Sequence, residues 1–156
     1  MDWAAIARAL HVLAVVHWIG GLMFVTLVVL PNLGELPPQQ RASGFAAVER
    51  RFAKQARISV ALAGLTGFYM MDVFGWWGQV LDPVMWRLGA MIALWTIFAF
   101  MLFIAEPLFL HGHFERRAKA DPVGAYKLLL RMHRILVALA VITVCGAVAG
   151  AHGFSY

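Results

Sequence analysis

The chain has 156 residues, of which 62% are hydrophobic and only 13% are charged. Soluble domains average about 45–50% apolar and about 25% charged residues, so most of this chain is not expected to face water. Its single cysteine, Cys145, excludes an internal disulfide and a cysteine-based metal cluster. The composition therefore excludes an ordinary soluble domain and indicates a protein that lies in a membrane.

Four apolar stretches are long enough to cross a bilayer, which takes about 20 residues of helix. We expect helices at residues 3–30, 58–74, 84–111 and 128–150. The first stretch lacks a basic start and a small-residue cleavage site, so we predict a retained helix that ends at Pro31 rather than a signal peptide. The predicted fold class is all-α, an integral membrane four-helix bundle that forms one transmembrane domain over residues 1–156.

The three connections between these helices differ in composition. Residues 31–44 are polar and rich in proline, and the amphipathic basic segment 45–57 follows them. We expect this segment either at the membrane interface or as an inward extension of the second helix. Residues 75–83 are short and aromatic, whereas residues 112–124 are basic and end in residues suited to a turn.

The positions of Lys and Arg predict how the helices are oriented. Eleven of the 13 flank the first and third connections, and only Arg8 and Arg87 lie near the other side. By the positive-inside rule those two connections are cytoplasmic, so both termini face outward. The net charge of +5 is then explained by topology and by lipid headgroups, and we expect no nucleic-acid partner.

Several histidines and one carboxylate lie within the apolar stretches, where ionisable groups are costly and often functional. A rise of about 1.5 Å per residue arranges them in two layers. His17 lies between an outer layer of His11, Met91 and His152 and an inner layer of Glu106, His111 and His133.

Histidines at similar depth on different helices are what six-coordinate haem b needs, because two axial ligands must approach one iron from opposite faces. A histidine together with a methionine would also serve. The candidate haem ligands are therefore His11, His17, His133 and His152, with Trp18 and Trp95 as candidate walls. The alternative is that each histidine only hydrogen-bonds a neighbouring helix.

Histidine and methionine are also suitable ligands for copper. The candidate copper ligands are His11, Met91 and His152. The chain has eight methionines, but no Met-x-x-Met pair and no His-Met cluster stands out among them.

Glu106 precedes Pro107 in the third apolar stretch. A carboxylate at this depth either pairs with an inner arginine, Arg57 or Arg134, or takes part in proton movement. We favour a structural ion pair, Glu106 with Arg57, which would lock the helices together on the cytoplasmic side.

Glycines on three of the four helices favour close helix packing. The pairs are Gly20 and Gly21, Gly64 and Gly67, and Gly146 and Gly150. Their faces can serve contacts within the bundle or a homodimer, and close approach of backbones also makes room for a flat cofactor.

Residues 10–31 (LHVLAVVHWIGGLMFVTLVVLP) resemble the opening span of the CopD-like family of small four-helix membrane proteins. This family is related to the copper-resistance protein D domain and, more distantly, to HemJ-type protoporphyrinogen oxidases. The resemblance continues through residues 48–58 (VERRFAKQARI), 62–70 (LAGLTGFYM), 102–111 (LFIAEPLFLH), 131–136 (RMHRIL) and 145–153 (CGAVAGAHG). It covers nearly the whole chain and implies a multi-pass bundle in the bacterial inner membrane.

Within this resemblance, His11 matches the first-helix histidine that HemJ-type proteins use in haem binding. The third helix departs from the pattern: Gly89 stands where relatives tend to carry a histidine, and Met91 where HemJ-type proteins carry a lysine. The HemJ-type reaction is therefore not implied, and His11 keeps Met91, His17 or His152 as a partner.

Three functions are consistent with these residues. The first is a haem b protein that carries electrons between a quinol or a periplasmic redox partner and an acceptor. The second is copper binding or transport of the CopD type, and the third is a cofactor-free structural subunit of a larger complex. The sequence contains no nucleotide-binding loop and no paired carboxylates, so it assigns no enzymatic reaction.

Overall fold

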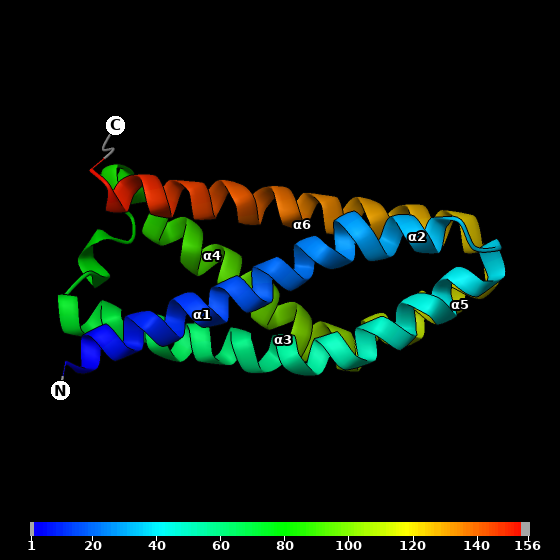
Figure 1. Ribbon diagram of the computed structural model, residues 1–156, viewed down its shortest axis with the longest axis horizontal. Coiled ribbons are helices and arrows are strands. Elements are labelled where there is room, and N and C mark those ends of the chain that lie inside the picture. Colours follow the sequence, from blue (N-terminus) through cyan, green and yellow to red (C-terminus); the bar gives the residue numbers. More distant parts are fainter. Residues whose placement is uncertain (1, 154–156) are drawn as a thin grey trace.

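The computed structural model describes residues 2–153, except for the side chains of Leu110 and His111. Four helical rods that are long and apolar enough to cross a membrane run over Trp3–Gly34, Pro38–Phe74, Pro83–Phe109 and Pro122–Ala151. The predicted all-α class and the multi-pass membrane character are confirmed. The rods form an elongated bundle, and the first and last described residues lie at the same end of it (Figure 1).

The first span is one continuous rod that consists of α1 (Trp3–Phe24), the π-helical turn η1 (Val25–Val29) and α2 (Leu30–Gly34). The expected end at Pro31 is therefore wrong. Proline lacks an N–H and its ring crowds the carbonyl four residues earlier, which normally stops a helix. Here a wider turn, in which the Leu30 N–H bonds the Val25 carbonyl, precedes the proline. Asn32 Nδ2 donates to the Val28 carbonyl at 2.8 Å, so the rod continues past the proline.

The second span is α3 (Pro38–Phe74), which includes the basic segment 45–57. Of the two arrangements expected for this segment, the structure shows the extension of the second helix. Phe45 and Ala56 are buried against the rest of the bundle, so the segment packs on protein. The helix ends at Gly75, whose φ of 64° is a left-handed conformation that glycine adopts at little cost.

The second half of the chain consists of two 3-10 turns, η2 (Trp77–Gln79) and η3 (Pro83–Met85), followed by α4 (Trp86–Phe100), the π-helical segment η4 (Met101–Leu110), α5 (His111–Ala120) and α6 (Pro122–Ala151). Residues 112–124, expected to connect two spans and to end in a turn, are mostly helical, and the break in the helix falls at Asp121, at the start of the expected turn. The polar helix α5 directly continues the third span. Only Asp121 separates it from α6, and the Asp121 carboxylate accepts the Gly124 N–H at 2.9 Å, which caps the new helix.

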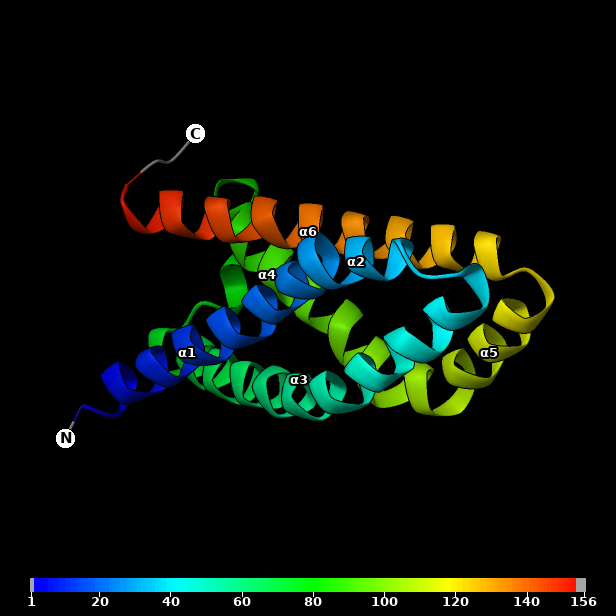
Figure 2. The same ribbon diagram turned by 45° about the vertical axis from the view of Figure 1, so that its right-hand side comes forward.

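The first span crosses the bundle diagonally. α1 lies along α3 near the chain ends, and the rod then crosses so that α2 lies beside α6 (Figures 1 and 2). The Tyr126 hydroxyl on α6 donates to the Leu30 carbonyl at 2.7 Å and holds the two helices together there. In the same half of the bundle a second buried cluster, Val25, Leu30 and Phe45, packs against Phe114 and Leu129, so η1, α2, α3, α5 and α6 are in contact there.

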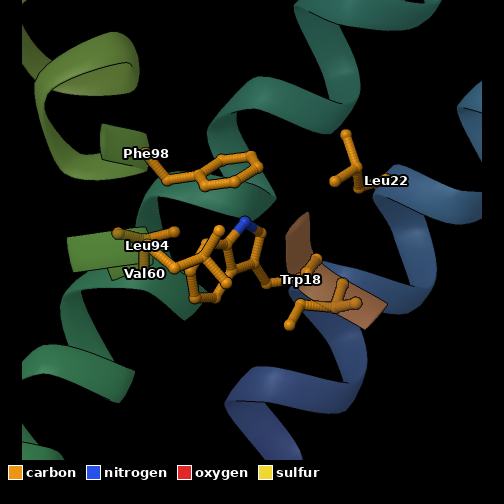
Figure 3. Packing of buried hydrophobic residues seen from close by; sticks show 7 residues of the cluster. Trp18, Leu22, Val60, Leu94 and Phe98 are labelled. Atoms are coloured by element: carbon orange, nitrogen blue, oxygen red, sulfur yellow. The ribbon is translucent and has the colours of Figure 1, made fainter. Parts of the chain in front are cut away.

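The core lies where all four spans meet. Its buried residues are Trp18, Ile19, Leu22, Val60, Leu94, Phe98 and Ala140. The Trp18 ring stands edge-on to Phe98, with 4.8 Å between the ring centroids (Figure 3). In the most apolar window of each span, core residues included, 33% or less is buried in the protein, so most apolar side chains face outward, as lipid contact requires.

Arg57 of α3 joins the second span to the third through two bonds. Its Nη2 lies 2.9 Å from Glu106 Oε2, so the ion pair expected from the sequence is present, whereas Arg134 is exposed. Its Nε donates to the Leu102 carbonyl at 3.0 Å. In a π-helix each carbonyl accepts the N–H five residues later, and for Leu102 that residue is Pro107, which has none. Arg57 therefore supplies the donor that the proline lacks.

Replacement of Arg57 tests this role. Arg57→Met leaves the Glu106 carboxylate, whose side chain is 23% exposed, without its cation and the Leu102 carbonyl without a donor. We expect the free energy of unfolding to fall by about 2 kcal/mol, measured by thermal or denaturant unfolding in mild detergent. Arg51→Met, on the same helix but exposed, is the control and should unfold like the parent protein. An unchanged transition in Arg57→Met would contradict the role.

The glycine faces expected from the sequence are mostly covered within the chain. The facing partners are Phe52 for Gly21, Trp95 for Gly64, His11 for Gly67, Trp86 for Gly146, and Arg87 for Gly150. Close packing of neighbouring helices in one chain therefore uses these faces. A homodimer through them would require these side chains to move.

Two glycines that differ in their surroundings form a matched test of this packing. A methyl group at Gly64 would lie 2.5 Å from the Trp95 ring, which a 2.8 Å hydrogen bond from Nε1 to the Val60 carbonyl holds in place. We expect Gly64→Ala to lower the free energy of unfolding by about 1–3 kcal/mol. Gly20→Ala meets no atom within 4 Å and should be neutral or slightly stabilising. Equal thermal midpoints by circular dichroism in the two variants would contradict this prediction.

Candidate functional site

A cavity of about 610 Å³ lies between α1, α3, η4, α5 and α6. It lies in the half of the bundle away from the chain ends, where α2, α5 and the start of α3 are found (Figures 1 and 2). Trp18 and Phe98 of the core line its inner end, and residues of α5 line the opposite end. Its volume falls within the range of about 300–1,000 Å³ that is typical of small-molecule and cofactor sites.

The cavity has an apolar body and a charged end. Its apolar walls include Leu22, Phe45, Val48, Phe52, Leu129 and Leu136. The charged side chains that line it are Glu49, Glu106, Arg116 and Arg117. We call Arg116 and Arg117 the arginine pair. With two carboxylates and two guanidinium groups, a site of this composition suits a molecule with a large apolar body and a polar end.

Trp18 carries a buried polar atom at the inner end. The side chain is 4% exposed, and its Nε1 has no hydrogen-bond partner among the residues described. Figure 3 shows this nitrogen directed towards the ring of Phe98, so the N–H faces an aromatic π-system, which is a weak acceptor. Trp18 therefore lines the cavity as an aromatic side chain, whereas Trp95 bonds the Val60 carbonyl and is not among the lining residues.

His133 of α6 is the candidate haem ligand that the structure places in the cavity wall. Its Nδ1 lies 3.0 Å from the Leu129 carbonyl, and a carbonyl can only accept, so Nδ1 carries the proton. The Nε2 lone pair is then left for a ligand, and no described residue hydrogen-bonds it. The Phe45 ring stands edge-on to the imidazole, with 5.6 Å between centroids. Metal-binding histidines usually have this arrangement, with the second nitrogen held by a carbonyl or carboxylate.

His113 of α5 also lines the cavity but has the opposite arrangement. Its Nδ1 lies 3.2 Å from Nη2 of Arg116. A guanidinium group only donates, so Nδ1 accepts, and the neutral ring carries its proton on Nε2. His113 therefore offers no free nitrogen lone pair in this geometry.

The other candidate residues lie outside the cavity. His11 is half-buried between α1 and α3, where its Nδ1 lies 2.9 Å from the Ala63 carbonyl. His17 is exposed and bonds the Ser59 hydroxyl at 2.8 Å. His152, at the end of α6, is exposed and bonds the Val148 carbonyl of its own helix at 2.9 Å. The bonds of His11 and His17 run to the neighbouring helix α3, as in the alternative expected from the sequence, whereas His152 bonds its own helix.

Of the four candidate haem ligands, His133 lines the cavity. The candidate copper ligands, His11, Met91 and His152, are not among the residues that line it. No three or more His, Cys, Asp or Glu side chains are grouped as a metal site within the residues described. The side chain of His111, assigned to the inner layer, lies outside them.

Sequence reasoning missed the arginine pair and two methionines of the cavity wall, Met101 and Met132. The sequence analysis used the arginines only to orient the spans, because residues 112–124 were expected to connect two of them. A helix through this segment would have placed them directly beyond the third span. The charged residues that directly follow His113 were the available signal for such a helix.

Comparisons with protein-family models, with curated proteins and with solved structures give no match for this chain.

Proposed function

We propose that the protein is an integral membrane haem b protein that binds the haem in this cavity and transfers electrons. The observation that carries the proposal is the position of His133, whose Nε2 lone pair is free and whose ring lines an apolar cavity of about 610 Å³. Of the four candidate ligands expected from the sequence, the proposal keeps only His133, because His11, His17 and His152 lie outside the cavity.

The residues of the cavity fit the parts of a haem. The apolar walls on α1, α3 and α6 would cover the macrocycle and exclude water from it. The arginine pair at the charged end would receive the two propionates, since guanidinium groups bind carboxylates through paired hydrogen bonds. His133 Nε2 would bind the iron, with the Leu129 carbonyl holding the proton on Nδ1 and fixing the ring. The iron would gain and lose one electron.

A bound quinone is a weaker match for the same cavity. A quinone carbonyl needs a hydrogen-bond donor, and His133 in its present tautomer presents an acceptor there. A quinol dissolved in the bilayer, or a periplasmic protein, remains suitable as the electron donor to the haem. No contact in the described residues favours the alternative of copper binding.

Replacement of His133 tests the proposal. The purified protein, supplied with haemin, should show a Soret band that shifts on reduction with dithionite. We expect His133→Ala to weaken haem binding by at least about 10–100-fold, because the ligand itself is removed. His17→Ala and His152→Ala are the controls and should keep their haem, with folding of all variants checked by circular dichroism.

A colourless protein that takes up no haemin would overturn the proposal and would favour the cofactor-free structural subunit. Elemental analysis of the same samples tests the alternative of copper. Bound copper that is lost in His11→Ala, without haem, would favour copper handling instead.

We further propose that the protein lies in the bacterial inner membrane with both termini outside. The distribution of Lys and Arg supports this orientation. In Figure 1, α5 with its basic residues lies at the end of the bundle opposite the first and last described residues. The charged end of the cavity would then face the cytoplasm.

Cysteine labelling tests the orientation. In a Cys145→Ala background, a cysteine at Trp3 should react with a membrane-impermeant maleimide in intact spheroplasts, because Trp3 is 63% exposed near the outer face. A cysteine at the exposed Lys119 should react only after the membrane is opened. The reverse pattern would contradict the orientation, and the background protein without cysteine is the control.

A further inference from the structure

We propose that the outward face of α6 binds a phospholipid with a net negative headgroup. This site lies apart from the cavity, so it goes beyond the proposed function. α6 forms one edge of the bundle in both views (Figures 1 and 2). Only 11% of its most apolar window is buried in the protein, against 22% or 33% in the other three spans. α6 is therefore the span that the rest of the chain covers least.

Three cations lie in one row along the first half of α6. They are Lys127, Arg131 and Arg134, which are spaced four and then three residues apart, and all three are exposed. Each residue turns an α-helix by about 100°, so this spacing places them on one face over about 10 Å of the helix axis. We call these three residues the cation row.

The cation row lies on the opposite face of α6 from the cavity. Leu129, His133 and Leu136 line the cavity, and each of them comes two residues after one of the cations. Two residues turn the helix by about 200°, so the cations are directed away from the cavity. The proposed haem site therefore leaves these three charges without a role.

The cation row has no acidic partner within the described part of the chain. α6 contains no Asp or Glu. No ion pair or hydrogen bond joins a described carboxylate to any of the three cations. Neighbouring like charges repel one another, and more strongly where the surroundings are less polar than water. An anion from outside the chain would therefore stabilise the row.

The face that carries the cation row continues without charge towards the end of α6. Residues 135–151 contain no charged side chain. The same helical spacing places four exposed residues on this face after the cations, namely Ala138, Val141, Cys145 and Val148.

This order matches the order of a phospholipid. A helix crosses the hydrocarbon core of about 30 Å with about 20 residues, and 20 residues counted back from Ala151 reach the cation row. The cations then lie at the depth of the headgroups, and the uncharged residues lie at the depth of the acyl chains. One lipid along this face would place its phosphate on the cations and its acyl chains on the apolar residues.

A second copy of the chain fits this face poorly. In a dimer with a two-fold axis the same surface meets itself, so in a parallel pair the two cation rows would face each other. Their repulsion opposes such a dimer, whereas an anionic lipid neutralises the same charges.

The experiment removes the cation row and measures lipid binding to the purified full chain in detergent. Phosphatidylglycerol, which is anionic, and phosphatidylcholine, which is neutral overall, are titrated separately, and bound lipid is counted by native mass spectrometry. The test variant combines Lys127→Gln, Arg131→Gln and Arg134→Gln. Each cation near an anionic lipid contributes about a fivefold gain in affinity, so we expect the affinity for phosphatidylglycerol to fall on the order of 100-fold. The parent protein should bind phosphatidylcholine weakly, and the variant should bind it equally weakly.

A control variant removes the same amount of charge from the first half of α3. It combines changes at three exposed residues, Arg50→Gln, Arg51→Gln and Lys54→Gln. Residues 50 and 51 diverge by about 100° around the helix, so these cations do not form a single row. We expect this variant to bind phosphatidylglycerol like the parent protein, with the helix content of both variants checked by circular dichroism.

The other outcomes would overturn the proposal. An equal loss of affinity in the two variants would show a general attraction to the basic part of the chain. Equal binding of the two lipids by the parent protein would show that the charge is not recognised, and full displacement of the lipid by inorganic phosphate would show a site for a free anion. A disulfide dimer through the exposed Cys145, together with no retained phosphatidylglycerol, would show that a second copy covers the face.

Discussion

The third span depends on one guanidinium group at the point where its backbone is weakest. A proline within a helix leaves a carbonyl without its donor, and in a membrane no water is present to replace it. Arg57 reaches from α3 to satisfy the Leu102 carbonyl and, with the same group, neutralises Glu106. A lysine could not hold both partners in this planar geometry, because its single nitrogen lacks the fork of an arginine. The span therefore stays helical across Pro107.

The cavity follows from how the helices are paired. Arg57 holds η4 against α3, and the Tyr126 hydroxyl holds α2 against α6 through the Leu30 carbonyl. Beyond the shared core the two pairs also touch, because buried Leu30 and Phe45 belong to one cluster with Phe114 and Leu129. The cavity is lined by residues of both groups, Trp18 and Phe98 of the core and Phe45 and Leu129 of the second cluster, and His133 is a further residue of its α6 wall.

The apolar runs in the sequence were sufficient to predict the all-α membrane class and the number of spans, since runs of about 20 apolar residues are typical of transmembrane helices. The ends of the spans could not be predicted from the residues next to them. Pro31 and Pro107 lie inside helical rods because of wide turns and, at Pro107, a donor from Arg57, which is distant in the sequence. Depth estimates placed His11 and His133 correctly within spans, but each residue turns a helix by about 100°. Only the rotation of each helix decides that His133 faces the cavity while His11 faces α3.

The unbroken run from α4 through η4 into α5 carries the third span from an apolar to a polar surface. Trp86 to Ala120 form a rod about 50 Å long at about 1.5 Å per residue. The hydrocarbon core of a bilayer is only about 30 Å thick, so the rod is longer than one apolar crossing requires, and α5 is its polar part. The cavity follows the same gradient, from Trp18 and Phe98 in the buried core to the exposed Arg116 and Arg117 on α5. A molecule bound along it would meet apolar side chains at one end and charged ones at the other.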